Sequence, residues 1–373
     1  MSEPPAEKPE ARGANFVGEW YGHRVYPVPS IPTIGLDDQR RERCPFLSTA
    51  LDTTVKCVKP PASAGVCTIS TRAGVDRQDW IVCPYRVLDL DMWTNVSARL
   101  FGGPPESLLL VAGPQLAKDD VQRRVLAHLA GGERALVYVQ DKLGGEISIA
   151  RTPRSPEFSF DVTIAELILQ DSVVQVGRYG ILEIQTMDFH GSYRAVVTNL
   201  RDALRLHGDG FHKALQSNER WLSERIEGPN ISNVFKRTFY QMMLKFQVGA
   251  QASCAGCVLA IPEAVWESWQ RHLGAPNLVR RGDVYEMLAP DREFAGPPPA
   301  WIYVFDLDPS GPSPNPIRIK KVIATDAESV AHYALRVAPE AAVGVGGSLD
   351  RVPVSIALRL RGWWSAVERP PMH

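Results

Sequence analysis

Four of the six cysteines in the chain lie within 40 residues of one another: Cys44, Cys57, Cys67 and Cys83. The segment around them, residues 16–89, has little of the periodic apolar sequence that would order it around a large core. Four thiolates suit one tetrahedral metal ion, and a bound ion can supply folding energy that a small core lacks. We therefore expect residues 16–89 to form a metal-binding subdomain with four cysteine ligands.

The spacing of these cysteines leaves an alternative open. They lack the two Cys-x2-Cys pairs of a zinc ribbon, and buried cysteines also occur simply as small apolar side chains. Proline follows the first and the last of them, at Pro45 and Pro84, which favours the metal site.

Farther along the chain, Cys254 and Cys257 form a single Cys-x2-Cys without a partner pair. We interpret these two as packing residues of a buried strand.

Composition excludes several classes of protein. The 373 residues are 45% hydrophobic and 22% charged, which is ordinary for a globular chain. No apolar run approaches the roughly 18 residues of a membrane span, so we expect no membrane partner. The first residues, MSEPPAEKPEARG, lack the basic and then apolar pattern of a signal peptide. We expect a cytoplasmic protein, in which thiols stay reduced, with a disordered tail over residues 1–15.

Hydrophobic periodicity predicts a mixed α/β sheet with helices between the strands. Strands are expected at 107–110, 135–139, 146–150, 158–167, 179–187, 258–261 and 301–306, and helices at 118–129, 231–247, 262–273 and 327–337. The strands 158–167 and 179–187 are joined by a short polar connection, so they should be adjacent and antiparallel. Residues 90–260 are predicted to form the core, and residues 261–373 a second α/β portion packed on it.

Those two strands carry a candidate magnesium site. Asp161 lies early in FSFDVTIAEL, and Glu183 and Gln185 follow 22 and 24 residues later in GILEIQT. Residues two apart on a strand project from the same face, so Asp161 on the neighbouring strand could meet both. Two carboxylates suit a hard cation, and the main-chain carbonyl of Ile184 is a further candidate ligand. The alternative is that both carboxylates are structural and held by hydrogen bonds.

Two other acidic residues nearby are excluded by strand periodicity. Glu166 lies an odd number of residues from Asp161, and Asp188 an odd number from Glu183, so in regular strands they should face the opposite side.

The net charge of −1 does not by itself indicate a nucleic-acid partner. However, residues 191–250 contain nine Lys or Arg against five Asp or Glu, a local excess that a phosphate-binding surface requires.

The ordered set of these motifs resembles the NotI-type restriction endonucleases of bacteria. The resemblance rests on CPF at Cys44, KC at Cys57, GVCTIS at Cys67, VCPYR at Cys83, FSFD at Asp161 and LEIQT at Glu183. It implies a PD-(D/E)XK nuclease core in which Asp161 and Glu183 bind Mg²⁺. Gln185 then occupies the position more often held by lysine, where a neutral amide could position water. It also implies that the four cysteines bind iron, although zinc would suit the same thiolates.

The same resemblance implies a homodimer that cuts a GC-rich palindrome in double-stranded DNA and leaves 5′-phosphate ends, with a separate DNA methyltransferase protecting the host site. Guanine is usually read by Arg or Lys in the major groove. Candidate readers are Arg194, Arg201, Arg205, Arg220, Lys236, Arg237 and Arg280, and Lys56, Lys59 or Arg86 near the cysteines could reach phosphates. Two alternatives stay open: a non-enzymatic DNA-binding protein built on the cysteine metal site, and a repair nuclease of the PD-(D/E)XK type without sequence preference.

Overall fold

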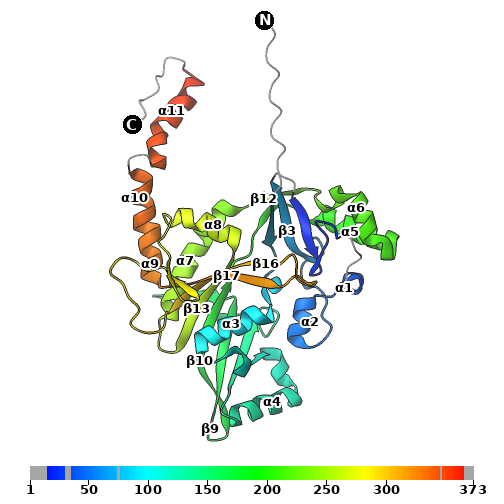
Figure 1. Ribbon diagram of the computed structural model, residues 1–373, viewed down its shortest axis with the longest axis vertical. Helices are drawn as coiled ribbons and strands as arrows, with labels where there is room; N and C mark the ends of the chain where they lie inside the picture. The colour runs from blue at the N-terminus through cyan, green and yellow to red at the C-terminus, as the bar shows by residue number, and fades with distance from the viewer. Residues whose placement is uncertain (1–14, 30–34, 74–75, 345–346, 365–373) are drawn as a thin grey trace.

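The computed structural model describes residues 15–29, 35–73, 76–344 and 347–364. Its centre is a nine-stranded mixed sheet flanked by helices (Figure 1), so the predicted mixed α/β architecture is confirmed. In spatial order the strands are β14 (Val279–Arg281), β15 (Val284–Glu286), β17 (Ile317–Thr325), β16 (Ala300–Leu307), β13 (Cys254–Pro262), β10 (Val173–Ile184), β9 (Val162–Gln170), β6 (Arg134–Gln140) and β5 (Leu108–Ala112). Most of the predicted tail, residues 1–14, lies outside the described residues.

The strands β9 and β10 are adjacent and antiparallel, as predicted, with Val162 opposite Leu182. At the hairpin end they extend farther than predicted, because a two-residue turn at Asp171 and Ser172 joins them directly. At the other end they are shorter than the predicted strands 158–167 and 179–187, since β9 begins at Val162 and β10 ends at Ile184. Both turn residues have positive φ, 50° and 64°, which matches the right-handed twist of a tight hairpin. On its other edge, β10 pairs in parallel with β13. The main sheet therefore continues across residue 260 into the C-terminal portion.

Helices cover the two faces of the main sheet. On one face lies α3 (Leu90–Phe101), whose Met92 and Trp93 share a core with Leu182 of β10. On the other face lie α7 (Ile231–Gly249) and α8 (Glu263–His272), which share a second core with Ile181 of the same strand. Neighbouring residues of β10 thus enter different cores, as strand alternation requires.

The cysteine-bearing segment forms a separate four-stranded antiparallel sheet. Its order is β2 (His23–Arg24), β1 (Asn15–Trp20), β3 (Val66–Ala73) and β4 (Asp76–Ile81), with the short helices α1 (Leu36–Arg41) and α2 (Pro45–Leu51) beside it. Its apolar residues pack against α5 (Arg194–His207) and α6 (Phe211–Ser217). Residues 16–89 have too few apolar residues to form this core alone, and helices from a distant part of the chain supply the rest of it.

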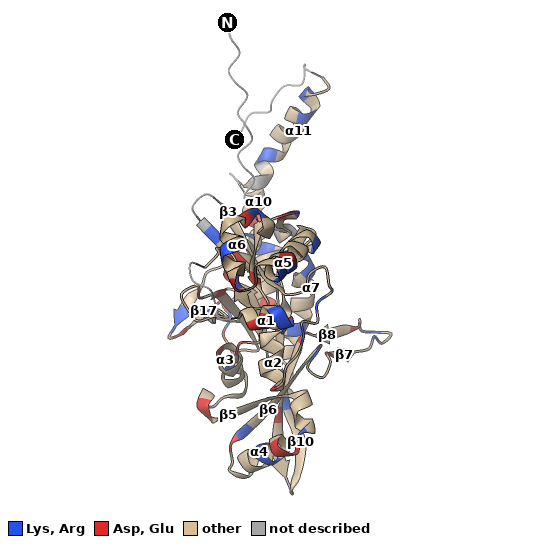
Figure 2. Cartoon of the chain, turned by 90° about the vertical axis from the view of Figure 1, so that its right-hand side faces the viewer, with Lys and Arg blue, Asp and Glu red and all other residues tan. Residues whose placement is uncertain are grey.

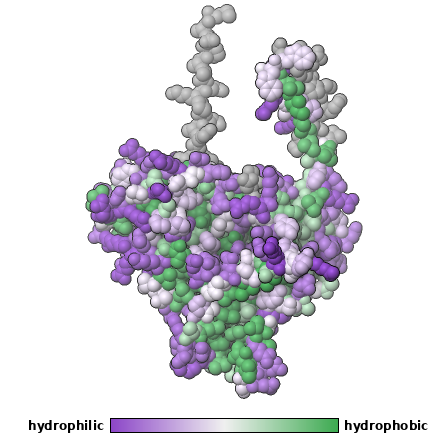
Figure 3. Space-filling view, turned by 180° about the vertical axis from the view of Figure 1, so that it is seen from behind, coloured by the Kyte–Doolittle hydropathy of each residue, from purple (hydrophilic) through white to green (hydrophobic). Residues whose placement is uncertain are grey.

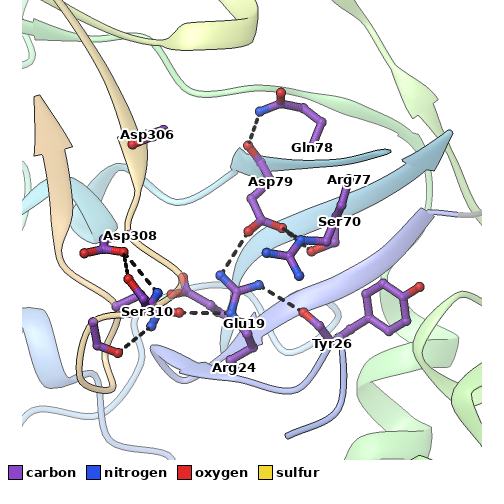
Figure 4. A network of polar contacts seen from close by, with 12 residues as sticks. Glu19, Arg24, Tyr26, Ser70, Arg77, Gln78, Asp79, Asp306, Asp308 and Ser310 are labelled. Carbon is purple, nitrogen blue, oxygen red and sulfur yellow. Dashed lines mark hydrogen bonds and ion pairs between the residues drawn. The ribbon is translucent and has the colours of Figure 1, made fainter. Parts of the chain in front are cut away.

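A polar network joins this small sheet to the loop between β16 and β17 (Figure 4). Arg24 donates to Asp79 over 2.9 Å and to the side chain of Asn315 over 2.9 Å. Arg86 and Glu19 form a fully buried ion pair, with N to O distances of 2.7 and 2.9 Å. Buried charges of this kind are tolerated only when paired, so the two sheets are held in a defined arrangement.

The remaining elements lie at the periphery. The helix α4 (Asp119–Ala130) covers the β5 and β6 end, and β11 (Phe189–Gly191) pairs with β12 (Ile226–Pro229). The helices α9 (Ala327–His332) and α10 (Ala338–Val343) lead to α11 (Val352–Arg361), which extends away from the body (Figure 1). Apolar residues show on the surface along α11 and near the β9–β10 end (Figure 3). Among the described helices, none has the length and apolar content to cross a membrane.

Candidate active site and cysteine cluster

The two predicted carboxylates meet at the end of the β9–β10 ladder. Asp161 immediately precedes β9, and Glu183 is the penultimate residue of β10. One carboxylate oxygen of Asp161 accepts a hydrogen bond from the main-chain N–H of Ile184 over 2.9 Å. In turn, Glu183 accepts one from the main-chain N–H of Asp161 over 3.2 Å. The structure therefore brings together the pair that strand periodicity predicted, and these N–H contacts also fit the alternative of structural carboxylates.

A lysine that sequence reasoning did not single out completes this pair. Lys245 of α7 forms an ion pair with Glu183, and the two side chains are only 5% and 12% exposed. Its neighbours on α7, Met242 and Phe246, lie in the apolar core. The signal in the sequence was a cation inside an apolar helical stripe, because a buried ammonium needs a carboxylate partner.

Gln185 also faces α7, two residues beyond Glu183. Its amide oxygen accepts a hydrogen bond from the hydroxyl of Thr238, and its amide nitrogen donates to the carbonyl of Thr186 over 2.6 Å. Thr238 and Lys245 are seven residues apart, about two turns along one face of the helix. The prediction that Glu183 and Gln185 share a face is therefore confirmed, and both ends of the amide of Gln185 are engaged.

A third carboxylate lies beside Asp161. Glu146 directly precedes β7 (Ile147–Ile149), which pairs with β8 (Phe158–Phe160), and Ile147 is opposite Phe160. The next pair outward from this register is Glu146 opposite Asp161. Partial burial and the charge of Asp161 raise the pKa of Glu146 above its ordinary value. Sequence periodicity places Glu146 at the start of a strand but not near Asp161, because it does not give the register of the hairpin.

The electrostatics of the cluster favour a cation. Burial, followed by the charge of Asp161, raises the pKa of Glu183 to about 8, and the ammonium of Lys245 opposes this shift. Two carboxylates at one buried position repel each other unless a positive charge offsets them. A divalent ion at this position would stabilise the ionised form of Glu183 beside Asp161. Oxygen donors of this kind are the ligands that Mg²⁺ prefers.

The acidic residues that periodicity excluded are engaged elsewhere. Glu166 forms an ion pair with Arg134 over 3.2 Å. Asp188 forms an exposed ion pair with Arg237 over 3.0 Å. Both carboxylates are therefore paired with arginines outside the site.

All four N-terminal cysteines line one small cavity of about 10 Å³, together with Tyr21, Lys59 and Tyr85. The main-chain N–H of Cys44 donates to Val55 over 2.8 Å, and that of Cys57 donates to Glu42 over 2.8 Å, so these two cysteines lie on facing segments. Cys67 lies on β3, and Cys83 follows the neighbouring strand β4. Residues 39 positions apart in sequence are thus gathered at one point.

The surroundings of the cavity favour thiolate at one of the cysteines and the protonated thiol at another. The main-chain N–H of Gly65 donates to the sulfur of Cys57 over 3.3 Å. A hydrogen bond from the thiol of Cys67 lowers the pKa of Cys83, with help from the charge of Lys59 and from main-chain N–H groups. Burial raises the pKa of Cys44 to about 12. Within the part of the chain that the structure describes, no set of three or more His, Cys, Asp or Glu side chains is arranged as an assembled metal centre.

Two basic residues near the cysteines are unavailable to phosphates, which corrects their suggested role. Arg86 is 1% exposed and is paired with Glu19. The ammonium of Lys59 donates to the carbonyls of Val66 and Val82 over 2.7 and 3.3 Å. Both side chains therefore brace the fold around the cysteine cavity.

The other two cysteines lie in the core. Cys254 and Cys257 are buried on β13 and belong to the apolar cluster beneath α7 and α8. Burial raises the pKa of both thiols. This placement is what packing residues of a buried strand require.

No protein-family model matches the chain, and no curated protein was found to match it. Its function therefore has to be argued from the carboxylate and cysteine sites themselves.

Proposed function

We propose that the chain is a Mg²⁺-dependent type II restriction endonuclease of the PD-(D/E)XK type, which hydrolyses double-stranded DNA at a specific site. The observation that supports this most is the meeting of Asp161 and Glu183 on adjacent strands, with buried Lys245 against Glu183. Two carboxylates and a lysine at the end of a strand pair are the side chains that metal-assisted phosphodiester hydrolysis needs.

The donors at this site fit magnesium. Asp161, Glu183 and the main-chain carbonyl of Ile184 would hold the ion, and Glu146 lies beside Asp161 as a further oxygen donor. Bound Mg²⁺ would supply charge stabilisation for the phosphate and would lower the pKa of the attacking water. The chain itself fixes both carboxylates through main-chain N–H groups, so little reorganisation is needed when the ion binds.

Lys245 takes over the role of the lysine that the family usually places at position 185. Its ammonium lies against Glu183 from α7, where it can stabilise negative charge on a phosphate bound at the carboxylates. Gln185 cannot supply a charge, and its amide is engaged with Thr238 and with Thr186. In this arrangement Gln185 ties α7 to β10 and so positions Lys245, and its second amide N–H and second oxygen lone pair can still position water.

The cysteine cluster completes the proposal. Cys44, Cys57, Cys67 and Cys83 surround one cavity, and an N–H group donates to the sulfur of Cys57, so the donor set fits iron or zinc as a structural ion. A homodimer would place one active site on each strand of a GC-rich palindrome. A separate methyltransferase would then protect the same sequence in the host.

The test compares the purified chain with Glu183→Ala and with Glu166→Gln. The second variant changes a carboxylate that pairs with Arg134 and should leave activity intact. Each protein is incubated with unmethylated GC-rich plasmid and Mg²⁺, and fragment ends are mapped by sequencing. We expect cuts at one palindrome from the wild type and Glu166→Gln, and none from Glu183→Ala. Tight binding without cutting would favour a DNA-binding protein, and cuts without sequence preference would favour a repair nuclease.

A further inference from the structure

The hairpin of β7 and β8 projects from the side of the molecule (Figure 2). It forms a separate two-stranded sheet, and its base carries Glu146 and Asp161 on facing positions. The loop between the two strands, residues 150–157, contains Arg151 and Arg154, and both side chains are exposed. The hairpin therefore connects the active-site carboxylates directly to a tip that carries two exposed arginines and one exposed carboxylate, Glu157.

The tip of this hairpin is held in one conformation by its own hydrogen bonds. The hydroxyl of Thr152 accepts from the main-chain N–H of Arg154 over 3.2 Å and from that of Ser155 over 3.0 Å. The main chains of Thr152 and Ser155 also pair with each other, and proline at position 153 restricts the turn further. A turn that is fixed in this way places the backbone of Arg151 and Arg154 before binding, so that only side-chain freedom remains to be lost.

The exposed side chains of this hairpin are turned towards solvent. Among the residues that the structure describes, none forms a hydrogen bond or an ion pair with the guanidinium of Arg151 or of Arg154. Ile147 and Ile149 on β7 are each 42% exposed. An isolated two-stranded hairpin is at best marginally stable in water, and this one leaves both apolar and cationic side chains in solvent. Both features indicate a surface that is completed by a ligand.

We infer that the β7–β8 hairpin enters the major groove of duplex DNA, where Arg151 and Arg154 read base edges within the target sequence. This inference rests on the proposed function. The major groove is about 12 Å wide and admits a two-stranded β-ribbon. Arginine pairs through two parallel hydrogen bonds with O6 and N7 of guanine, which is the commonest specific contact there.

The length of the hairpin fits this arrangement. Arg151 is five residues beyond Glu146, and an extended strand advances about 3.3 Å per residue, so the tip lies roughly 17 Å from the carboxylates. Base pairs are spaced about 3.4 Å apart along each strand, so this distance corresponds to about five base pairs. The arginines would thus read positions inside a palindrome of ordinary length rather than distant flanking DNA.

Two sets of variants separate base reading from simple attraction to phosphates. Arg151→Ala with Arg154→Ala removes both guanidiniums, and Arg151→Lys with Arg154→Lys keeps the charge but loses the two-pronged hydrogen bonding. Arg123→Ala is the matched control, because it changes an exposed arginine on α4. Thermal unfolding of each variant checks that the fold is retained.

Binding is measured by fluorescence anisotropy in Ca²⁺ without Mg²⁺, on a duplex containing the mapped cleavage site and on a scrambled duplex of equal composition. We expect both double variants to lose about 10-fold or more affinity for the site duplex. The lysine variant should keep its affinity for the scrambled duplex, and Arg123→Ala should match the wild type on both. Unchanged affinity in the alanine variant, or equal losses on both duplexes that lysine restores, would overturn the inference.

Failure of groove reading by the hairpin can be distinguished from failure of the proposed nuclease function. If the wild type cuts no DNA, the nuclease assignment fails, and the hairpin is tested with a pool of random GC-rich duplexes. Sequences retained by the wild type and by the lysine variant are then compared. Selection of a common sequence by the wild type alone supports groove reading by the arginines, and identical pools from both proteins overturn it.

Discussion

Lys245 on α7 forms an ion pair with Glu183 on β10, 62 residues away in the sequence, and the two side chains are only 5% and 12% exposed. The pair crosses from the helix layer to the sheet, so it depends on how α7 lies over the strands. Gln185 and Thr238 make a second contact between the same two elements, about two helical turns away. These two contacts fix the position of α7. Among the described residues, Lys245 of this helix is the only cation that contacts Asp161 or Glu183.

Replacing Lys245 with methionine should abolish cutting while leaving DNA binding measurable. Loss of a positioned charge of this kind typically slows a reaction by about 100-fold or more. Single-turnover cleavage of plasmid in saturating Mg²⁺ is the measurement, with Lys245→Arg expected to keep part of the rate. Because an unpaired Glu183 would also destabilise the fold, Glu183→Gln with Lys245→Met serves as a stability control that should melt like the wild type yet stay inactive. Wild-type rates in Lys245→Met would refute the role.

The stability of the metal-free protein should depend on pH through Glu183. Its pKa is raised by burial to about 8, so the folded state holds this proton more tightly than the unfolded state. Its contribution to stability is then full below about pH 4.5 and is lost as the pH rises towards about 8. In chelator, the unfolding free energy of the wild type should fall over this range by up to about 1.4 kcal/mol per pH unit.

Urea titrations of the wild type and Glu183→Gln at several pH values measure this dependence. The variant lacks the titrating group, so its unfolding free energy should fall less steeply between about pH 5 and 8. If the unfolding free energies of the two proteins change in parallel with pH, Glu183 is already ionised across this range because it pairs with Lys245.

Removing the metal from the cysteine cluster should destabilise the N-terminal sheet. We expect one iron or zinc ion per chain in the purified protein, measured by elemental analysis. Cys67→Ser should lose this ion and lower the melting temperature by about 5 °C or more, because metal binding contributes directly to folding. Cys254→Ser is the matched control, since its thiol lies in the other core and should leave the metal content unchanged. A metal-free wild type that melts like Cys67→Ser would return the cysteines to a packing role.

Strand periodicity was sufficient to predict that Glu183 and Gln185 share a face and that Asp161 lies on the neighbouring strand. These relationships follow from the two-residue repeat of a strand and need no knowledge of the rest of the fold. The helix α3 could also have been predicted, because Met92, Val96 and Leu100 follow a helical repeat after the capping residue Asp89. Its cap is visible in the structure as a hydrogen bond from the N–H of Met92 to Asp89 over 3.1 Å.

Lys245 and Glu146 could not be placed from sequence. The position of Lys245 depends on which face of α7 meets the sheet, and that is decided by the packing of Met242 and Phe246 against the core. The position of Glu146 depends on the register of a hairpin, and a shift of one residue would have turned it away from Asp161. The local pattern marks Lys245 as a cation in an apolar stripe, but which carboxylate it meets, like the partner of Glu146, is a tertiary relationship.

Glu146 should tune the magnesium requirement of the reaction rather than its chemistry. It lies next to Asp161 through the β7–β8 register, and its pKa is raised by partial burial and by that neighbour. A further oxygen donor strengthens the binding of a hard cation, so Glu146→Gln should need about 10-fold more Mg²⁺ for half-maximal cutting. Glu157→Gln is the matched control, because it changes an exposed carboxylate on the same hairpin.

The measurement for Glu146 is the cutting rate across a range of Mg²⁺ concentrations. With the ion at saturation, Glu146→Gln should approach the wild-type rate, since Asp161, Glu183 and Lys245 are intact. If its magnesium dependence equals that of Glu157→Gln, Glu146 holds no ion and only adds negative charge at the mouth of the site. If the rate stays low at every concentration, Glu146 contacts the reacting phosphate region directly, and its carboxylate takes part in the chemistry beside Asp161.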